Sequence, residues 1–374
     1  MTLKDSQKSL LEHSEVKVRL LKLYLESYLS ILSNSQHIGN IHIFDLFCGQ
    51  GIYEDGGEGS PIVILNSIRD AFFSSNSKKF SRKFNCHFND SDSHKVDHLK
   101  AIVDQKELTH KEIGTFSFAK EDYRVLVPKV IKKLNAISLN ERAFIFIDPY
   151  GYKDLQFSDI KDMLSNGKSE VLLFLPTQFM FRFEKGGTPK ALFNFINELV
   201  PVDKWPKSST GLDFIETLKN AFRTNLGSKY FVDSFIISRG LNQFFCLFFF
   251  TGHILGFEKM LEAKWKLDKE DGLGWHFRSE GDLFDLIEKE PNTKKFEESL
   301  LEFLKSTRTN GEIYLFTLQN GYLCSHANQI LKLWQKSNKI DVTNIDGTIS
   351  RKGAFYLNYK NYTNNSNRIN IKVR

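Results

Sequence analysis

The chain contains the stretch Ile41-His42-Ile43-Phe44-Asp45-Leu46-Phe47-Cys48-Gly49-Gln50-Gly51. Here a short apolar run ends in an acidic residue, and two glycines spaced two apart follow it. Glycine at such positions lets the backbone turn tightly and lets a ligand approach where a Cβ would block it. Open α/β sheets bind nucleotide-like cofactors at the carboxyl ends of their strands. The stretch therefore predicts a cofactor-binding turn after the first strand of such a sheet.

A second apolar run also ends in an acid, in Ala143-Phe144-Ile145-Phe146-Ile147-Asp148-Pro149-Tyr150-Gly151. A buried parallel strand reads as a continuous apolar run, and ligands bind at its carboxyl end. The two motifs together resemble the first and fourth motifs of class I S-adenosylmethionine (SAM) dependent methyltransferases. The resemblance implies that the glycine-rich turn cradles the methionine moiety of SAM. It also implies that Asp148, Pro149 and Tyr150 are the catalytic candidates, because an Asp-Pro-aromatic turn holds a flat base with an exocyclic amine.

Further acids follow the next two predicted strands. The strand 84–88 ends at Asn89-Asp90-Ser91-Asp92, and the strand 115–119 leads to Asp122. An acid at the end of the second strand accepts hydrogen bonds from the ribose hydroxyls of a cofactor, which points to Asp90, whereas Asp92 is expected to cap the next helix. We expect Asp122 to meet the adenine amino group, with a turn or helix cap as the alternative. The predicted cofactor contacts are Asp45, Phe47, Gly49, Gly51, Asp90 and Asp122.

Strands and helices alternate along the first three quarters of the chain. Besides the strands named above, we expect strands at 169–176, 230–238 and 243–251, the last two forming an antiparallel pair, and helices at 14–33, 62–73, 125–134 and 256–267. In the first helix, Ser14 is a predicted N-cap, and Lys17, Arg19 and Lys22 form a predicted basic flank. The alternation predicts an α/β fold with a doubly wound, Rossmann-like methyltransferase sheet over residues 1–282.

The pattern changes to short helices past Leu283. Helices are expected at 294–304, 313–318 and 325–336, followed by strands at 339–342 and 353–357 around a turn at Asp346-Gly347. Three helices and a hairpin predict a winged helix-turn-helix domain over residues 283–374, whose third helix would enter the major groove while the wing touches the backbone. An alternative is that the wing packs against a protein partner. The predicted nucleic-acid contacts are His326, Asn328, Gln329 and Lys332 on the helix and Arg351 and Lys352 on the wing.

Charge and composition agree with a two-part protein of 374 residues. Residues 283–374 hold 14 Lys/Arg against 9 Asp/Glu, while the whole chain holds 51 against 45, so most of the excess is C-terminal. A basic module on a near-neutral larger part is typical of a nucleic-acid-binding domain attached to an enzyme. Four cysteines without metal or disulfide spacing, no long apolar run and no basic, apolar leader predict a cytoplasmic protein.

An ordered set of motifs is more specific than any one of them. The chain shows His13-Ser14-Glu15-Val16-Lys17, the two strand motifs, Gly59-Ser60-Pro61, Phe181-Arg182, and Thr251-Gly252-His253 before Gly256-Phe257-Glu258-Lys259-Met260. Over most of its length it resembles the bacterial three-Cys-motif partner proteins. The resemblance implies a methyltransferase-like domain using SAM, a C-terminal winged helix and a partner protein that bears a three-cysteine motif. The chain departs from the family at Cys48, where a small residue is usual, and in the offset of the acid within Asn89-Asp90.

The residues favour methyl transfer to an exocyclic amine of a base that is flipped out of a duplex or single-stranded. Methylation at cytosine C5 needs a thiolate, normally in a Pro-Cys turn, and none of the four cysteines follows a proline. A nicotinamide dehydrogenase would show a third glycine in register after Gly51, and Tyr53-Glu54 stands there instead.

Two alternatives remain open. The fold could act as a non-catalytic nucleic-acid-binding adaptor, or as a metal-dependent nuclease. For the nuclease, the acids that could assemble are Glu54, Asp55, Glu58, Asp90 and Asp148. These acids are scattered and fit cofactor contacts and loop solvation better, so no metal site is predicted.

Overall fold

The computed structural model describes residues 12–53, 55–75, 79, 81–151, 154–178, 180–181, 190–200, 208, 210–238, 244–276, 290–364 and 366–374. The predicted domain boundary at residue 283, and also Glu54 and Arg182, lie outside these residues. The chain divides into two compact units, one formed by residues 1–253 with 275–278 and the other by residues 254–274 with 279–374. No helix among the described residues is long and apolar enough to cross a membrane.

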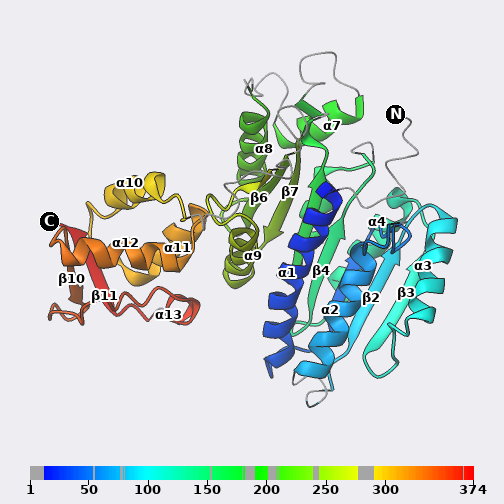
Figure 1. The fold of residues 1–374 in the computed structure, drawn as a ribbon, viewed down its shortest axis with the longest axis horizontal. Helices are drawn as coiled ribbons and strands as arrows, with labels where there is room; N and C mark the ends of the chain where they lie inside the picture. The colour runs from blue at the N-terminus through cyan, green and yellow to red at the C-terminus, as the bar shows by residue number, and fades with distance from the viewer. Residues whose placement is uncertain are drawn as a thin grey trace. The chain divides into compact units, whose positions relative to one another are not determined.

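The first unit is built on a mostly parallel sheet (Figure 1). Its strands are β1 Ile41–Asp45, β2 Phe84–Asn89, β3 Gly114–Ala119, β4 Arg142–Ile147, β5 Ser169–Leu175, β6 Phe231–Ser238, β7 Phe244–Thr251 and β8 Gly274–His276, in the order β3-β2-β1-β4-β5-β7-β6-β8. The strands from β3 to β5 run parallel, and β7 runs antiparallel to both of its neighbours. The expected doubly wound α/β sheet and its antiparallel pair are confirmed.

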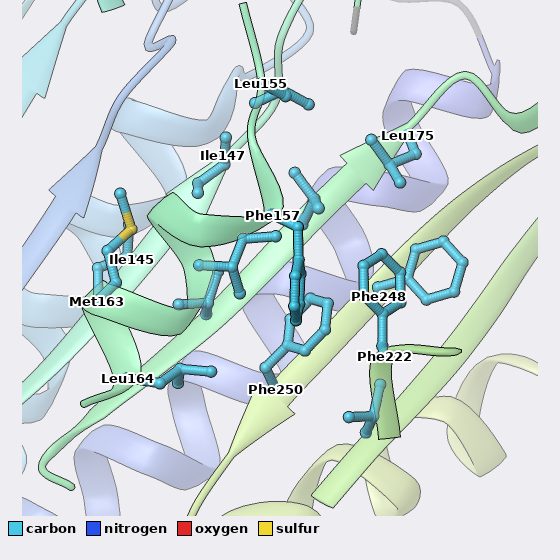
Figure 2. Packing of buried hydrophobic residues seen from close by; sticks show 14 of the residues in the cluster. Ile145, Ile147, Leu155, Phe157, Met163, Leu164, Leu175, Phe222, Phe248 and Phe250 are labelled. Carbon is cyan, nitrogen blue, oxygen red and sulfur yellow. The ribbon is translucent and has the colours of Figure 1, made fainter. Parts of the chain in front are cut away.

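Helices cover both faces of this sheet. They are α1 Glu12–Asn34, α2 Ser60–Ser74, α3 Ser93–Gln105, α4 Tyr123–Ala136, α5 Phe157–Leu164, α7 Lys190–Leu199 and α8 Gly211–Leu226. Alternate residues of β4 point to opposite faces: Ile145 lies in the core beneath α4, α5, α7 and α8, whereas Phe144 packs against Tyr24 of α1 with ring centroids 5.6 Å apart. Figure 2 shows the first of these cores, where Phe157 of α5 and Phe222 of α8 meet β7. Because both faces of the central strand β4 are buried, its residues 143–147 are all apolar.

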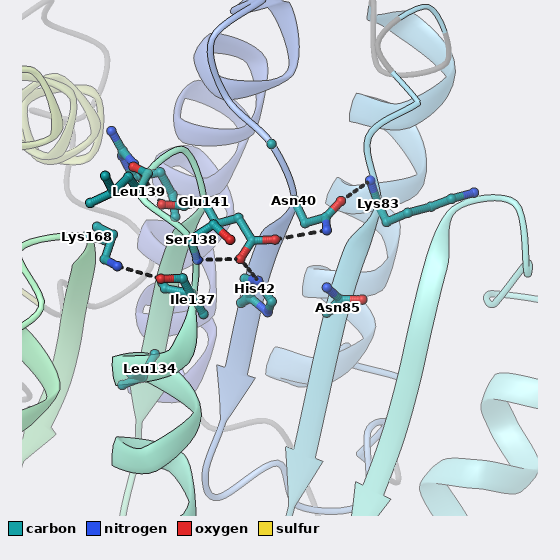
Figure 3. Close-up of polar contacts among 12 residues, drawn as sticks. Asn40, His42, Lys83, Asn85, Leu134, Ile137, Ser138, Leu139, Glu141 and Lys168 are labelled. Carbon is teal, nitrogen blue, oxygen red and sulfur yellow. Dashed lines mark hydrogen bonds and ion pairs between the residues drawn. The ribbon is translucent and has the colours of Figure 1, made fainter.

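The amino ends of the strands are fixed by polar contacts (Figure 3). The carboxylate of Glu141 accepts hydrogen bonds from Asn40 Nδ2 at 2.9 Å and from the backbone N–H of Ser138 at 2.9 Å, and it lies 3.5 Å from His42 Nε2. Asn40 in turn accepts a hydrogen bond from the N–H of Lys83, 3.1 Å away, which links the start of β1 to the start of β2. These contacts hold the strand register at one edge and leave the opposite, carboxyl edge for a site.

Helix α1 is held to the sheet by a buried carboxyl group. Glu170, at the start of β5, accepts hydrogen bonds from the Tyr24 hydroxyl and from Thr251 Oγ1, the latter at 2.7 Å. Burial raises the pKa of Glu170 to about 7, although both hydrogen bonds act in the opposite direction. The helix begins by Glu12, so Ser14 lies inside it, and the prediction of Ser14 as the N-cap is wrong.

The second unit is a helical bundle with a small sheet. It contains α9 Ile254–Leu267, α10 Lys294–Phe303, β9 Arg308–Thr309, α11 Asn310–Gln319, α12 Cys324–Lys336, β10 Ile340–Asn344, α13 Tyr359–Thr363 and β11 Ile369–Val373. Apolar residues of α10, α11, α12 and the sheet form one core. Helix α9 joins this unit through a hydrogen bond from the Tyr314 hydroxyl to Glu258, 2.8 Å long, and another from Trp265 Nε1 to the carbonyl of Gly321, 2.9 Å long.

The prediction of the winged helix-turn-helix is confirmed for the helices, the first wing strand and the turn, but not for the second wing strand. Three helices precede β10 as expected, and a turn at residues 346–347 follows it. The prediction of a second strand at 353–357 is wrong, because β10 pairs antiparallel with β11 instead. Gly353 has φ +75° and Tyr356 has φ +54°, and a left-handed backbone cannot continue an extended strand. Asn358 then caps the short helix α13.

Candidate functional site

The candidate site lies where the strand order reverses. Strand β1 is hydrogen-bonded to β2 on one side and to β4 on the other, and all three run parallel, so their carboxyl ends meet at one edge. The N–H of Leu46 donates to the carbonyl of Phe146, 3.1 Å away, and the N–H of Cys48 donates to that of Asn89, 2.8 Å away. The chain after β1 thus lies between the ends of β2 and β4. Such a switch point is where open α/β sheets bind ligands.

The glycine-rich turn depends on left-handed backbone at two positions. Gly49 has φ +62° and Gly51 has φ +88°. A Cβ on Gly51 would lie 2.6 Å from Leu99 Cδ1, so this glycine is needed for packing. A Cβ on Gly49 would meet nothing within 4 Å among the described atoms, so the space beside this residue is open. The lack of a side chain at Gly51 is thus required for packing against Leu99, whereas its lack at Gly49 leaves open space for a ligand at the switch point.

Asp45 stabilises the glycine-rich turn from the buried side, through hydrogen bonds. Its carboxyl is fully buried and accepts hydrogen bonds from Ser60 Oγ at 2.7 Å and from the N–H of Phe47 at 3.4 Å. Burial raises the pKa of Asp45 to about 7, and the neighbouring carboxylates of Asp148 and Asp90 add to the rise. Asp45 therefore ties the end of β1 to the start of α2 and shapes the turn.

Asp90 connects the turn to the end of β2. Its carboxylate accepts hydrogen bonds from the N–H of Gly49 at 3.1 Å, from the N–H of Asp92 at 2.9 Å and from the Tyr150 hydroxyl at 3.4 Å. Asp92 caps α3 by accepting from the N–H of His94, 2.9 Å away, which confirms the predicted cap. Asp90 is the acid that lies beside both sequence motifs.

Asp148 has a partner that the sequence reading missed. Its Oδ2 forms an ion pair with Lys17 Nζ of α1, and this ammonium group also lies 4.5 Å from the centroid of the Phe174 ring. Lys17 is only 6% exposed, so its assignment to the basic flank is wrong, whereas Arg19 and Lys22 are exposed as expected. Among the described residues, no hydrogen bond engages Asp148 Oδ1.

A sequence signal for Lys17 did exist. It lies four residues before Leu21 and seven before Tyr24, which places it on the buried stripe of α1. A charged residue on such a stripe needs a buried partner of opposite charge, because an unpaired charge is costly to bury. Ser60 and Lys95 are further neighbours of the site that the sequence reading did not assign.

Tyr150 lies at the solvent-exposed surface of the site. Its side chain is 64% exposed, its hydroxyl accepts a hydrogen bond from Lys95 Nζ, and that ammonium group lies 4.1 Å from the ring centroid. Pro149 is buried between Asp148 and Tyr150 and fixes the backbone there. The structure therefore brings together Asp45, Gly49, Gly51, Asp90 and the Asp148–Tyr150 turn.

Two of the predicted cofactor residues are engaged elsewhere. The Phe47 ring stacks on Tyr123 of α4, with ring centroids 5.1 Å apart. Asp122 is exposed and caps α4 by accepting a hydrogen bond from the N–H of Arg124, 2.8 Å away. The alternative of a helix cap is thus what Asp122 shows, and its contact with adenine stays a prediction.

The predicted nucleic-acid residues lie on the surface of the second unit. Gln329 and Lys332 of α12 are exposed, Asn328 is half-buried, and Arg351 and Lys352 are exposed after the turn at 346–347. His326 is only 6% exposed and meets the Trp265 ring, with centroids 4.3 Å apart. Burial lowers the pKa of His326 to about 4. The prediction that His326 faces a groove is wrong.

Residues 268–347 match the family model described as a GMT-like wHTH domain. This match agrees with the winged helix-turn-helix seen in the second unit. No curated protein shows significant sequence similarity to the chain.

Several solved methyltransferase structures are similar to part of the chain at low identity. The methyltransferase domain of bacterial CtHen1-C is 13% identical, covering 62% of this chain and 98% of that one, with a TM-score of 0.31. An O-methyltransferase from Bacillus cereus, in complex with SAH, is 9% identical over 61% and 80%, with a TM-score of 0.31. TomG, an O-methyltransferase from Streptomyces achromogenes in complex with SAM, is 9% identical over 67% and 100%, with a TM-score of 0.34. All three TM-scores lie below 0.5, and it is the strand order and directions that establish the class I methyltransferase-like α/β fold.

Proposed function

We propose that the chain is a SAM-dependent methyltransferase that acts on an exocyclic base amine of nucleic acid. The observation that carries the proposal is the position of the Asp148-Pro149-Tyr150 turn. It lies at the switch point of the sheet, beside the left-handed turn at Gly49 and the carboxylate of Asp90. One edge of the sheet thus offers both a place for a cofactor and a place for a flat base.

The residues present fit SAM. The open space beside Gly49 admits a ligand close to the backbone, and Asp90 supplies carboxylate oxygens next to that space. Asp45 holds the turn in shape from within the core. When bound, SAM would supply a methyl group on a positively charged sulfur, and the transfer forms an N–C bond as the S–C bond breaks.

Asp148 and Tyr150 are proposed to position the acceptor base. Asp148 Oδ1 can accept a hydrogen bond from an exocyclic amine and so aim the nitrogen lone pair, because Oδ2 is already held by Lys17. The exposed Tyr150 ring can stack on a base taken out of its duplex. The amine loses one proton as the N–C bond forms, and the carboxylate of Asp148 is placed to accept it.

The alternatives keep less support. Among the residues that the structure describes, no three potential ligands are grouped so that they could hold a metal ion, and nothing else favours a nuclease. The three-Cys-motif partner and a bacterial setting belong to the proposal on the motif resemblance alone, and a cytoplasmic setting belongs to it on the cysteine spacing and composition.

Replacing Gly49 with alanine should remove cofactor binding while the protein stays folded. The new methyl group would enter the open space and exclude the ligand, whereas the left-handed backbone costs a non-glycine residue only about 1–2 kcal/mol. We expect calorimetric titration with SAM and with S-adenosylhomocysteine to show binding to the wild type. For G49A we expect an affinity lowered at least tenfold, which corresponds to about 1.4 kcal/mol.

Gly227→Ala is the matched control for this test. Gly227 also has a positive φ, +79°, and open space around its Cβ position, but it follows α8 near the amino edge of the sheet. Its substitution should cost similar stability and leave binding unchanged. Equal binding by both variants and the wild type would place the cofactor elsewhere, and no binding by the wild type would favour the adaptor.

The second unit is proposed to bind the nucleic acid through α12 and the segment after the turn. Changing Lys332 and Arg351 to glutamine removes two exposed positive charges. We expect the double variant to bind duplex DNA or RNA roughly tenfold more weakly near physiological salt. The dependence of log affinity on log salt should also lose a slope of about 2, because each phosphate contact contributes close to one unit.

Lys294→Gln is the control for nucleic-acid binding. Lys294 is exposed at the start of α10 in the same unit, outside the predicted interface. Its loss should change neither the affinity nor the salt slope. If the double variant keeps the wild-type affinity and slope, Lys332 and Arg351 do not contact the nucleic acid. If the wild type binds neither DNA nor RNA, the second unit is expected to contact a protein partner instead.

A further inference from the structure

The carboxylate of Asp90 is nearly saturated with hydrogen-bond donors. Oδ2 accepts from the N–H of Gly49 at 3.1 Å and from the Tyr150 hydroxyl at 3.4 Å, and Oδ1 accepts from the N–H of Asp92 at 2.9 Å. An ionised carboxylate offers roughly four acceptor positions on its two oxygens. Three donors from the described residues therefore leave room for about one more.

A ribose that donates both of its vicinal hydroxyls to Asp90 needs two of these positions. The two backbone donors cannot leave, since the N–H of Gly49 belongs to the cofactor turn and that of Asp92 to the start of α3. The Tyr150 hydroxyl is the one donor on a rotatable, exposed side chain. Only its departure frees the second position.

We propose that the Tyr150 hydroxyl and the ribose of the cofactor compete for Asp90, so that cofactor binding releases Tyr150. This inference rests on the proposed function and adds an order to it. In the free protein the Tyr150 hydroxyl is hydrogen-bonded to Asp90. The cofactor binds first and displaces this hydroxyl, and the Tyr150 ring can then move to stack on the base. Before the cofactor binds, the hydrogen bond to Asp90 keeps the Tyr150 ring from moving to stack on a base.

Lys95 stabilises the position in which the Tyr150 hydroxyl donates to Asp90. Its ammonium group donates to the Tyr150 oxygen and lies 4.1 Å from the ring centroid, while the hydroxyl proton points to Asp90. The chain Lys95–Tyr150–Asp90 places a positive group, a hydroxyl and a carboxylate in series, and such hydrogen bonds reinforce one another. Removal of the hydroxyl alone breaks the series and keeps the ring.

Tyr150→Phe tests the inference by calorimetric titration with S-adenosylhomocysteine. The variant loses the competing donor, so it should bind S-adenosylhomocysteine three- to tenfold more tightly than the wild type. Tyr230→Phe is the matched control, since it makes the same chemical change and breaks a 3.0 Å hydrogen bond to the carbonyl of Leu164. Tyr230 precedes β6 at the amino edge of the sheet, so Y230F should bind within twofold of the wild type.

The outcomes separate the inference from the proposed function. Tighter binding by Y150F, or binding by Y150F where the wild type shows none, supports the competition. Equal or weaker binding by Y150F beside a wild type that binds overturns the competition and leaves the proposed function in place. If none of the three proteins binds, the cofactor pocket itself is refuted, and the competition with it.

Discussion

Asp148→Asn is expected to reduce methyl transfer by roughly a hundredfold or more and to destabilise the protein as well. The carboxylate that is proposed to accept the hydrogen bond and the proton of the amine is lost. Positioned acids and bases of this kind raise reaction rates by factors of about 10² to 10⁴. The substitution also leaves the ammonium of Lys17 buried without its partner, since the two side chains are 8% and 18% exposed. Removal of one member of a buried pair costs about 3 kcal/mol or more.

The double variant Lys17→Met/Asp148→Asn separates these two effects. With neither charge present, no ion is left unpaired, so the free energy of unfolding should return to within about 1 kcal/mol of the wild type. Transfer of labelled methyl from SAM to nucleic acid should stay low. Urea unfolding measures the first quantity and scintillation counting the second.

An exposed ion pair supplies the control for stability. Lys129 and Glu121 lie 2.7 Å apart with side chains 56% and 34% exposed, so Glu121→Gln should cost less than about 1 kcal/mol. If D148N proves as mild as this control, Lys17 and Asp148 do not form a buried pair in solution. Stability restored together with activity in the double variant would remove Asp148 from the reaction.

The stability of the protein should fall as the pH rises from about 4.5 to about 7. Burial raises the pKa of Glu170 from 4.5 to about 7, and it raises that of Asp45 from 3.8 to about 7. Between the unfolded and folded values the native state keeps a proton that the unfolded state has released. Stability from these groups is therefore full below the unfolded pKa and is lost as the pH rises through 7. For Glu170 the loss is about 3 kcal/mol.

Glu170→Gln should flatten this dependence. The amide stays neutral at every pH and can still bond the hydroxyls of Tyr24 and Thr251. The free energy of unfolding of the variant, measured by urea at pH 5 and at pH 8, should fall less than that of the wild type by about 3 kcal/mol. Equal pH slopes would show that Glu170 is ionised in the folded protein at neutral pH.

The sheet could be predicted because its central strands β4 and β5 are buried on both faces. Ile145 faces one core and Phe144 the other, so β4 reads as a continuous apolar run that ends at an acid. The same reasoning located β5 and β7, whereas β2 and β6 were recognised although polar residues interrupt them. The edge where the site lies then follows from the direction of the strands.

Other features depend on contacts between residues far apart in the sequence. The run 353–357 has the composition of a strand, but left-handed residues and a helix cap override that preference. His326 has the position of a groove-facing residue, yet Trp265 covers it. The position of Lys17 on the buried stripe of α1 indicates that it needs an acidic partner, but nothing in its own segment identifies Asp148 as that partner. The pair Tyr150–Asp90 likewise leaves no local signal in either segment.

The link from α1 to the site has a consequence for synthesis on the ribosome. Asp148 follows Lys17 by 131 residues, and Glu170 follows Tyr24 by 146. At roughly 5–20 residues per second, about 7 to 30 seconds pass between the synthesis of α1 and that of these buried partners. Helix α1 is thus made well before the carboxyl groups that it docks on, and in that interval its apolar stripe with one lysine is open to a chaperone.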